Sequence, residues 1–179
     1  NIRLINSIAF YTSYVFAEES KITRGQLSNL DFKTKAIQEI TFNRTASGTA
    51  TIISNKNAAV ALLTAAHVVS FEDTIYSYFI NKDGTPTNYI QSISVKTKQT
   101  TYIPDFPDNG EVDIILSDKT LDVALLGRQF LGNHATNLSP FKFAWGNSSE
   151  LEWGTFIYVF GFPMNYKMIS KGIVSNPNK

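Results

Sequence analysis

Apolar and polar residues alternate in short runs along most of this sequence, and turns rich in Gly, Asn, Asp and Pro separate the runs. Residues 34–43 and 89–97 alternate with a period of two, which predicts half-buried strands, and the other runs are short and apolar or rich in β-branched and aromatic residues. Hardly any segment shows the period of a helix. Seven strands are expected before Gly127. Their short and repeated spacing predicts an all-β fold, either an antiparallel barrel or a sandwich. The expected strands lie at residues 34–43, 48–54, 58–64, 74–80, 89–97, 111–117 and 121–127.

The regions that flank these strands are less regular. Residues 1–32 are expected to form an N-terminal arm or helix and a surface connection, ahead of the strand-rich block at residues 33–132. Residues 133–179 contain a linker and two further strand-like runs, at 153–163 and 168–175. Because two strands do not make a stable domain by themselves, residues downstream of position 179 are expected to complete this second block.

The composition is that of a globular protein, since 43% of the 179 residues are hydrophobic, 17% are charged and the formal net charge is +1. No basic run is longer than a pair, so nothing favours nucleic acid as a partner. The longest apolar run, residues 58–69, is too short to span a membrane. The absence of cysteine removes disulfides, thiolate metal sites and a cysteine nucleophile from within the chain. The two histidines form no ligand-like cluster, which argues against structural zinc.

The same features bear on where the protein works. A chain without cysteine suits the cytosol and the bacterial periplasm equally. Residues 8–17 resemble the tail of a secretory signal, which favours a secreted or periplasmic location. The sequence sets no oligomeric state.

The stretch Thr64–Val69, "TAAHVV", ends an apolar run with a histidine among small residues. An imidazole can act as a general base near neutral pH if it is held rigidly and has a partner on each ring nitrogen. The alanines before His67 have no bulk, so the turn that carries the ring can press closely against its neighbours. The alternative is a core histidine that is satisfied by a backbone carbonyl.

A second candidate is Asp122, which stands just ahead of the apolar strand in "LDVALL". A carboxylate there can accept the Nδ1–H of a histidine, which fixes the tautomer of the ring and stabilises the imidazolium. The alternative is that Asp122 only caps the turn that follows Asp118 and Lys119.

Together, "SGT" at residues 47–49, "LTAAHVV" and "DVALL" resemble the trypsin-like serine peptidases, in particular their cysteine-poor HtrA-like branch. The resemblance implies a double β-barrel, with the first barrel nearly complete at residues 33–132 and the second only begun. It implies an endopeptidase that acts on polypeptides without a cofactor, with His67 as the base and Asp122 as the acid of a Ser-His-Asp triad. In the last part of the chain, the positions that match the family's scaffold are Gly154, Gly161, Pro163, Gly172, Ile173, Val174 and Ser175.

The nucleophile of such a triad is not found. In the family it follows "GIVS" within a glycine-rich turn, and nothing after Ser175 has that form. Ser148 stands in "GNSSE", where Ser149 and Glu150 replace the two glycines, and a carboxylate would oppose a developing oxyanion. Ser175 fits no better. The serine is therefore expected downstream of residue 179, and the 179-residue chain alone is expected to be inactive.

Two other interpretations stay open: a non-catalytic pseudopeptidase that binds peptides on the same fold, and a cysteine nucleophile outside this sequence. The remaining polar residues are weaker candidates. His134 is expected to be solvated in a turn, and Glu111 and Asp113 to share a solvated strand face. Asp105 and Asp108 lie in a loop with Asn109 but lack the spacing of an EF-hand calcium site.

Overall fold

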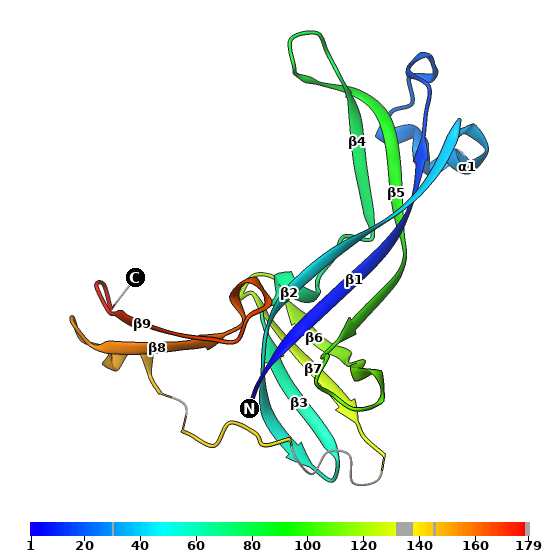
Figure 1. Cartoon of the computed structure of the whole chain (residues 1–179). Helices are drawn as coiled ribbons and strands as arrows, with labels where there is room; N and C mark the ends of the chain where they lie inside the picture. Colours follow the sequence, from blue (N-terminus) through cyan, green and yellow to red (C-terminus); the bar gives the residue numbers. More distant parts are fainter. Residues whose placement is uncertain (30, 132–137, 145, 178–179) are drawn as a thin grey trace. The chain divides into compact units, whose positions relative to one another are not determined.

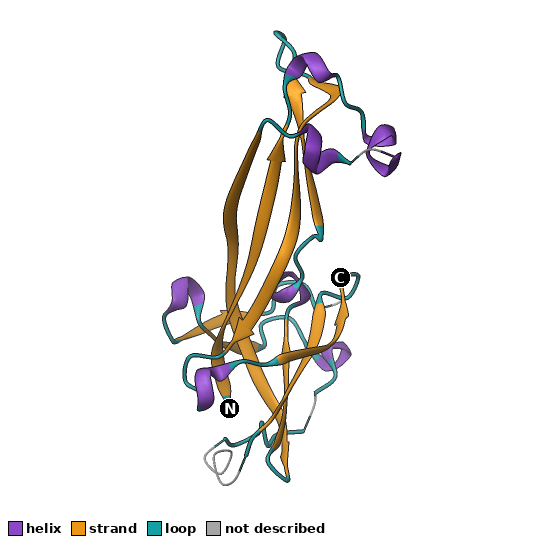
Figure 2. Cartoon of the chain, turned by 90° about the vertical axis from the view of Figure 1, so that its right-hand side faces the viewer, coloured by secondary structure: helices purple, strands orange, loops and turns teal. Residues whose placement is uncertain are grey.

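We analysed a computed structural model of the chain, which describes residues 1–29, 31–131, 138–144 and 146–177. The fold is all-β, as the alternating pattern predicts (Figure 2). A seven-stranded antiparallel sheet has the strand order β4-β5-β1-β2-β3-β7-β6, and β8 and β9 pair in a separate two-stranded sheet (Figure 1). The strands are β1 (Ile2–Val15), β2 (Gln38–Lys56), β3 (Ala59–Thr64), β4 (Thr74–Ile80), β5 (Pro86–Tyr102), β6 (Asp113–Asp118), β7 (Val123–Gln129), β8 (Phe156–Gly161) and β9 (Met168–Ile173).

The helices are short, at most six residues each, and lie between strands. The two α-helical turns are α1 (Phe32–Lys35) and α2 (Ala66–Val69) in the described part of the chain. None of the described helices is long and apolar enough to cross a membrane. The 3₁₀ turns are Glu18–Ser20, Arg24–Asn29, Asp108–Gly110, Ser148–Glu150 and Pro163–Asn165.

The chain divides into two compact units that alternate along the sequence. The first contains residues 1–7, 46–70 and 101–179, and the second contains residues 8–45 and 71–100. The long strands β1, β2 and β5 each contribute residues to both units. The compact units are therefore interleaved in sequence, whereas the ranges expected from the sequence, 1–32, 33–132 and 133–179, are consecutive.

The N-terminal segment corrects one sequence prediction in part: of the arm or helix expected there, residues 2–15 form no helix but the extended strand β1 between β5 and β2. From residue 5 to residue 13 its buried side chains follow a period of two, but two of them are serines, which hide the alternation from a hydropathy pattern. Ser7 Oγ lies 2.7 Å from Thr101 Oγ1 in the first unit, and Ser94 Oγ donates to Ser13 Oγ at 3.0 Å in the second. These bonds make the buried hydroxyls tolerable in the interior.

Strand β2 corrects a second prediction. The expected half-buried strand at residues 34–43 and the expected strand at 48–54 belong to one continuous strand, which begins at Gln38. Residues 38–45 of this strand are exposed, Ile40 and Phe42 among them, so its first half does not bury one face. Thr34 and Lys35, which were expected to begin the strand, lie in α1.

The core of the first unit lies between β2, β3 and β7 and beneath α2. Leu62 of β3 is paired with Leu126 of β7, and both side chains are fully buried, as is Ile52 of β2. Burying a side chain of this size stabilises the fold by roughly 1.5–3 kcal/mol. Val68 and Val69 of α2 belong to the same cluster, so the core fixes the helical turn on which His67 stands.

The second unit has a smaller core of its own. Tyr14, Phe16, Ile90 and Ile93 are buried together, and the Tyr11 hydroxyl donates to the Glu72 carbonyl at 2.8 Å. The buried cluster packs β1 against β5, and the Tyr11 bond ties β1 to the connection before β4, without involving either candidate site residue.

Candidate active site

His67 lies at the second position of α2, directly after strand β3. Its neighbours Ala66, Val68 and Val69 are buried, so the helical turn presents the His67 side chain to the outside, where it is 72% exposed. The turn ends at Ser70, whose N–H donates to the Ala66 carbonyl at 2.8 Å. The alternative of a core histidine bound to a backbone carbonyl is therefore wrong, because the ring is exposed and its Nδ1 is bonded to a carboxylate.

The segment at residues 47–49 supports α2 from β2. A Cβ atom at Gly48 would lie 2.6 Å from Cγ2 of Val68, which is closer than two carbon atoms can approach. Glycine at this position therefore lets α2 pack directly against the strand. Beside it, the buried Thr64 hydroxyl donates to the Thr49 carbonyl at 2.9 Å. The two motifs that the sequence analysis considered together are thus in contact.

Asp122 reaches α2 from the turn between β6 and β7. Its Oδ1 accepts the backbone N–H of His67 at 2.9 Å, and its Oδ2 lies 2.7 Å from Nδ1 of the same residue. One carboxylate therefore binds both the backbone and the ring of His67. The structure brings together the two residues that the sequence singled out, although they are 55 positions apart.

The electrostatics of the pair favour an ionised Asp122. The backbone N–H of His67 is the largest cause that lowers the pKa of Asp122 below its ordinary value, followed by the side-chain bond to the same residue. Desolvation acts in the opposite direction but is outweighed. An ionised carboxylate can only accept hydrogen bonds, so Nδ1 of His67 must carry the proton that lies between them. In the neutral ring this leaves a lone pair on Nε2, which is the state that a general base requires.

The turn that holds Asp122 is capped by another residue. Asp118 Oδ1 accepts the N–H of Thr120 at 2.8 Å and that of Leu121 at 3.0 Å. The alternative interpretation of Asp122, that it merely caps this turn, is therefore wrong, because Asp118 fills that role. Asp118 was not among the residues predicted from the sequence, although an aspartate two residues before a threonine in a hairpin turn is a signal of such a cap.

The candidate nucleophiles do not join the pair. Ser148 lies in an exposed 3₁₀ turn whose hydrogen bonds are local, and Ser175 is exposed after β9. Within the ranges that the structure describes, neither hydroxyl is bonded to His67, and Nε2 of His67 has no hydrogen-bond partner.

The weaker candidates form no second centre. His134 lies outside the described residues. The carbonyls of Glu111 and Asp108 both accept hydrogen bonds from the Arg128 guanidinium, that of Asp108 at 2.7 Å, which gives this loop a structural role. Across the described parts of the chain, His, Asp and Glu side chains form no group of three that could hold a metal ion.

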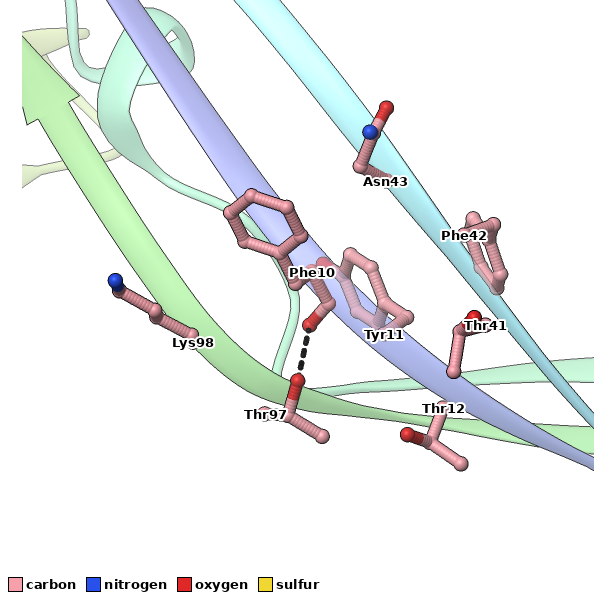
Figure 3. Close-up of a pocket in the computed structure, with 8 residues that line it drawn as sticks. All are labelled: Phe10, Tyr11, Thr12, Thr41, Phe42, Asn43, Thr97 and Lys98. Carbon is pink, nitrogen blue, oxygen red and sulfur yellow. Dashed lines mark hydrogen bonds between the residues drawn. The ribbon is translucent and has the colours of Figure 1, made fainter.

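Two surface hollows lie apart from the pair. One, of about 740 Å³, is in the first unit between residues 47–49 and the β8–β9 hairpin, and the Thr49 hydroxyl there accepts the N–H of Phe162 at 3.0 Å. The other, of about 590 Å³, is in the second unit and is lined by side chains of β1, β2 and β5 (Figure 3). In it Tyr11 stacks on Phe42 with ring centres 5.2 Å apart, and Thr97 donates to the Phe10 carbonyl at 3.2 Å (Figure 3). Neither hollow is lined by His67 or Asp122.

A scan against protein-family models and a search of the curated proteins give no match to this chain. The case for a function therefore depends on the geometry of the His67–Asp122 pair and on the resemblance in its motifs.

Proposed function

We propose that this chain carries the base and the acid of a trypsin-like serine endopeptidase, His67 and Asp122, and that a residue outside these 179 supplies the serine. The observation that supports this most directly is the double contact of Asp122 with the N–H and with Nδ1 of His67, at 2.9 and 2.7 Å. A carboxylate that only neutralised a nearby charge would not need both atoms. A carboxylate that orients a catalytic ring does need them, because the two bonds fix the position and the tautomer of the imidazole together.

The proposed reaction is acyl transfer to a serine. Nε2 of His67 takes the proton of the serine hydroxyl while the serine oxygen attacks the carbonyl carbon of the peptide bond. The imidazolium that forms then gives this proton to the leaving amine as the C–N bond breaks. Water repeats the sequence to release the acyl group and regenerate the serine. Asp122 remains ionised throughout and stabilises the imidazolium, which is consistent with its lowered pKa.

A second candidate function is non-catalytic peptide binding. Strands β8 and β9 form a two-stranded sheet, and their apolar residues are exposed, with Phe156, Tyr158 and Val159 all more than half accessible. Unpaired strand edges with apolar side chains can hold an extended peptide by adding a strand. This function does not use the His67–Asp122 pair, so a test that depends on the pair separates the two functions.

The test is labelling of the natural protein that carries this sequence with a fluorophosphonate, which reacts with activated serines. We expect one serine to be labelled and the label to be lost in His67→Ala, whereas the matched control His134→Ala keeps it. Asp122→Asn should slow peptide hydrolysis by about 10⁴-fold, because the wrong tautomer of His67 is then held in place.

The expected result for residues 1–179 by themselves is no hydrolysis of casein. Turnover by this chain that is abolished in His67→Ala would refute the placement of the nucleophile outside it. A natural protein that takes no label yet binds extended peptides would refute the peptidase and support the binding module.

A further inference from the structure

The hairpin between β6 and β7 is tied to α2 at both ends of its turn. Asp118 and Val123 form the last pair of the ladder, so residues 119–122 make the turn. On one side of the turn, Ser117 Oγ lies 2.9 Å from Ser70 Oγ, just beyond α2. On the other side, Asp122 binds His67. The conformation of the intervening residues therefore decides where the Asp122 carboxylate is placed.

Asp122 itself has a backbone conformation that a residue with a Cβ atom seldom adopts. Its φ is +52°, in the left-handed region, where the side chain crowds the backbone. Such a conformation persists only where neighbouring interactions hold it. The bonds to His67 are one such interaction. They form only when the Asp122 side chain is already in place, so they cannot be what places it.

The Asp118 side chain binds the residues inside the turn, and it does so independently of His67. Its Oδ1 accepts the N–H groups of Thr120 and Leu121 at 2.8 and 3.0 Å, the two residues that immediately precede Asp122. Both N–H groups point at one atom, so their peptide planes are fixed relative to β6. Without this acceptor, these exposed N–H groups would bond to water, and the turn would be free to adopt several conformations.

We propose that Asp118 is a positioning residue for the His67–Asp122 pair, and that it acts through its side-chain acceptor oxygen. It touches neither ring nitrogen and takes no part in proton transfer. Its effect on turnover rests on the proposed peptidase function, whereas its effect on the tautomer of His67 does not.

The chain provides a matched control for this idea. In the turn between β4 and β5, within the other compact unit, Asp83 Oδ1 accepts the N–H of Thr85 at 2.9 Å and its hydroxyl at 2.7 Å. Asp83→Ala therefore removes the same kind of cap from a hairpin that does not contain the pair. Asp118→Asn is the second control, because its amide oxygen can accept the same two N–H groups without the charge.

The experiment measures the tautomer of His67 in the full chain from its two ring ¹⁵N shifts, detected through the carbon-bound ring protons. His134→Gln assigns the signals, since the sequence has two histidines. We expect Nδ1–H in the parent chain, in Asp83→Ala and in Asp118→Asn. In Asp118→Ala we expect this preference to be lost, with a mixture of both tautomers, while the amide spectrum of the rest of the chain is unchanged.

Retention of Nδ1–H in a folded Asp118→Ala variant would overturn the proposal, and so would its loss in Asp118→Asn, since charge and not the acceptor would then be responsible. If Asp118→Ala does not fold, Asp118→Glu makes the same test, because it keeps the charge but moves the acceptor by one carbon; retained Nδ1–H there overturns the proposal equally. In the natural protein, absence of fluorophosphonate labelling would refute the peptidase alone and leave the tautomer result standing.

Discussion

Replacing Gly48 by alanine tests whether the close approach of β2 to α2 is a requirement of the site. The added Cβ would lie 2.6 Å from Cγ2 and 3.3 Å from Cγ1 of Val68. Val68 is buried and β-branched, so its methyl groups cannot turn away without entering other core atoms. Gly48 has no positive φ that would burden alanine, so the effect is steric.

The magnitude follows from this contact. Overpacking by one methyl group costs about 1–3 kcal/mol, and the reduced freedom of the unfolded chain returns about 0.4–1 kcal/mol. We therefore expect the free energy of unfolding to fall by roughly 1–2 kcal/mol, which lowers the urea midpoint by about 0.5–1 M at a slope near 2 kcal/mol per M. Because α2 carries His67, the preference of its ring for the Nδ1–H tautomer should also decrease.

A double-mutant cycle identifies the cause. Val68→Ala removes two buried methyl groups and should cost about 2 kcal/mol by itself. In the double variant, the Cβ introduced by Gly48→Ala fills the space that Val68 vacates, so the loss should be about 1–2 kcal/mol smaller than the sum of the single losses. Gly146→Ala is the control, since a Cβ there meets nothing within 4 Å. Losses that simply add, or a Gly48→Ala variant as stable as Gly146→Ala, would refute the reasoning.

Two further predictions concern a charge and a turn. The pKa of Asp122, followed by its ¹³C carboxyl shift, should be below the ordinary value and should rise only part of the way in His67→Ala, because the backbone N–H, its largest cause, remains. Since the pKa of Asp122 is lowered in the folded state, its ionised carboxylate stabilises the fold above the ordinary pKa, and this contribution is lost as the pH falls through the folded-state pKa. A return of the pKa to its full ordinary value in His67→Ala would contradict the assignment of the backbone N–H as the largest cause. Gly110→Ala should cost more than about 2 kcal/mol in urea unfolding, because its φ is +67° and a Cβ would lie 2.1 Å from the Ile103 carbonyl oxygen. Gly84→Ala, at φ +84° in open space, should cost only about 1 kcal/mol, and equal losses would contradict the steric argument.

The side-chain pattern predicted β4 well, because residues 74–80 are rich in β-branched and aromatic residues and coincide with this strand at both ends. It failed for β1, because Ser7 and Ser13 stand on the buried face and are satisfied by hydroxyl partners far away in the sequence. A pattern of residues along one segment contains no information about such partners. The all-β class was nevertheless predictable, because enough strands have apolar buried faces.

The length of β2 could not be predicted for a different reason. Arg44–Gly48 is polar with a glycine at its end, so it is typical of a turn between two strands. The structure instead continues the strand through it, and the glycine serves the contact with Val68. The sequence does not distinguish a glycine that makes room for a neighbouring side chain from one that ends a strand, because the difference lies in a tertiary contact.

In the site, too, some residues can be predicted from the local sequence and others only from tertiary contacts. His67 and Asp122 were predicted because each stands in a distinctive local stretch, and the structure brings their side chains into contact. Asp118 was not predicted, because an aspartate in a surface turn has the same local appearance whether or not a functional side chain depends on that turn. The role that we propose for Asp118 depends on a tertiary contact, because Asp122, with its positive φ, reaches α2 from this turn.

The geometry of the His67–Asp122 pair is set by contacts within this chain. The core beneath α2, Gly48 and the capped turn determine how His67 and Asp122 face each other, and all of these contacts lie within the first unit. The side chains themselves are 72% and 50% exposed, so water screens their interaction. The two hydrogen bonds of Asp122 to His67 can still select one tautomer in such surroundings, but stabilising an imidazolium beside a reacting peptide requires that water be excluded. Under the proposed function, orientation is therefore built into this chain, and the segment that brings the serine, with the bound peptide, must provide the dry surroundings. Substitutions in the core beneath α2, at Gly48 or in the capped turn should change the tautomer of His67 in residues 1–179 alone. Substitutions in the segment that brings the serine should change only the turnover of peptides.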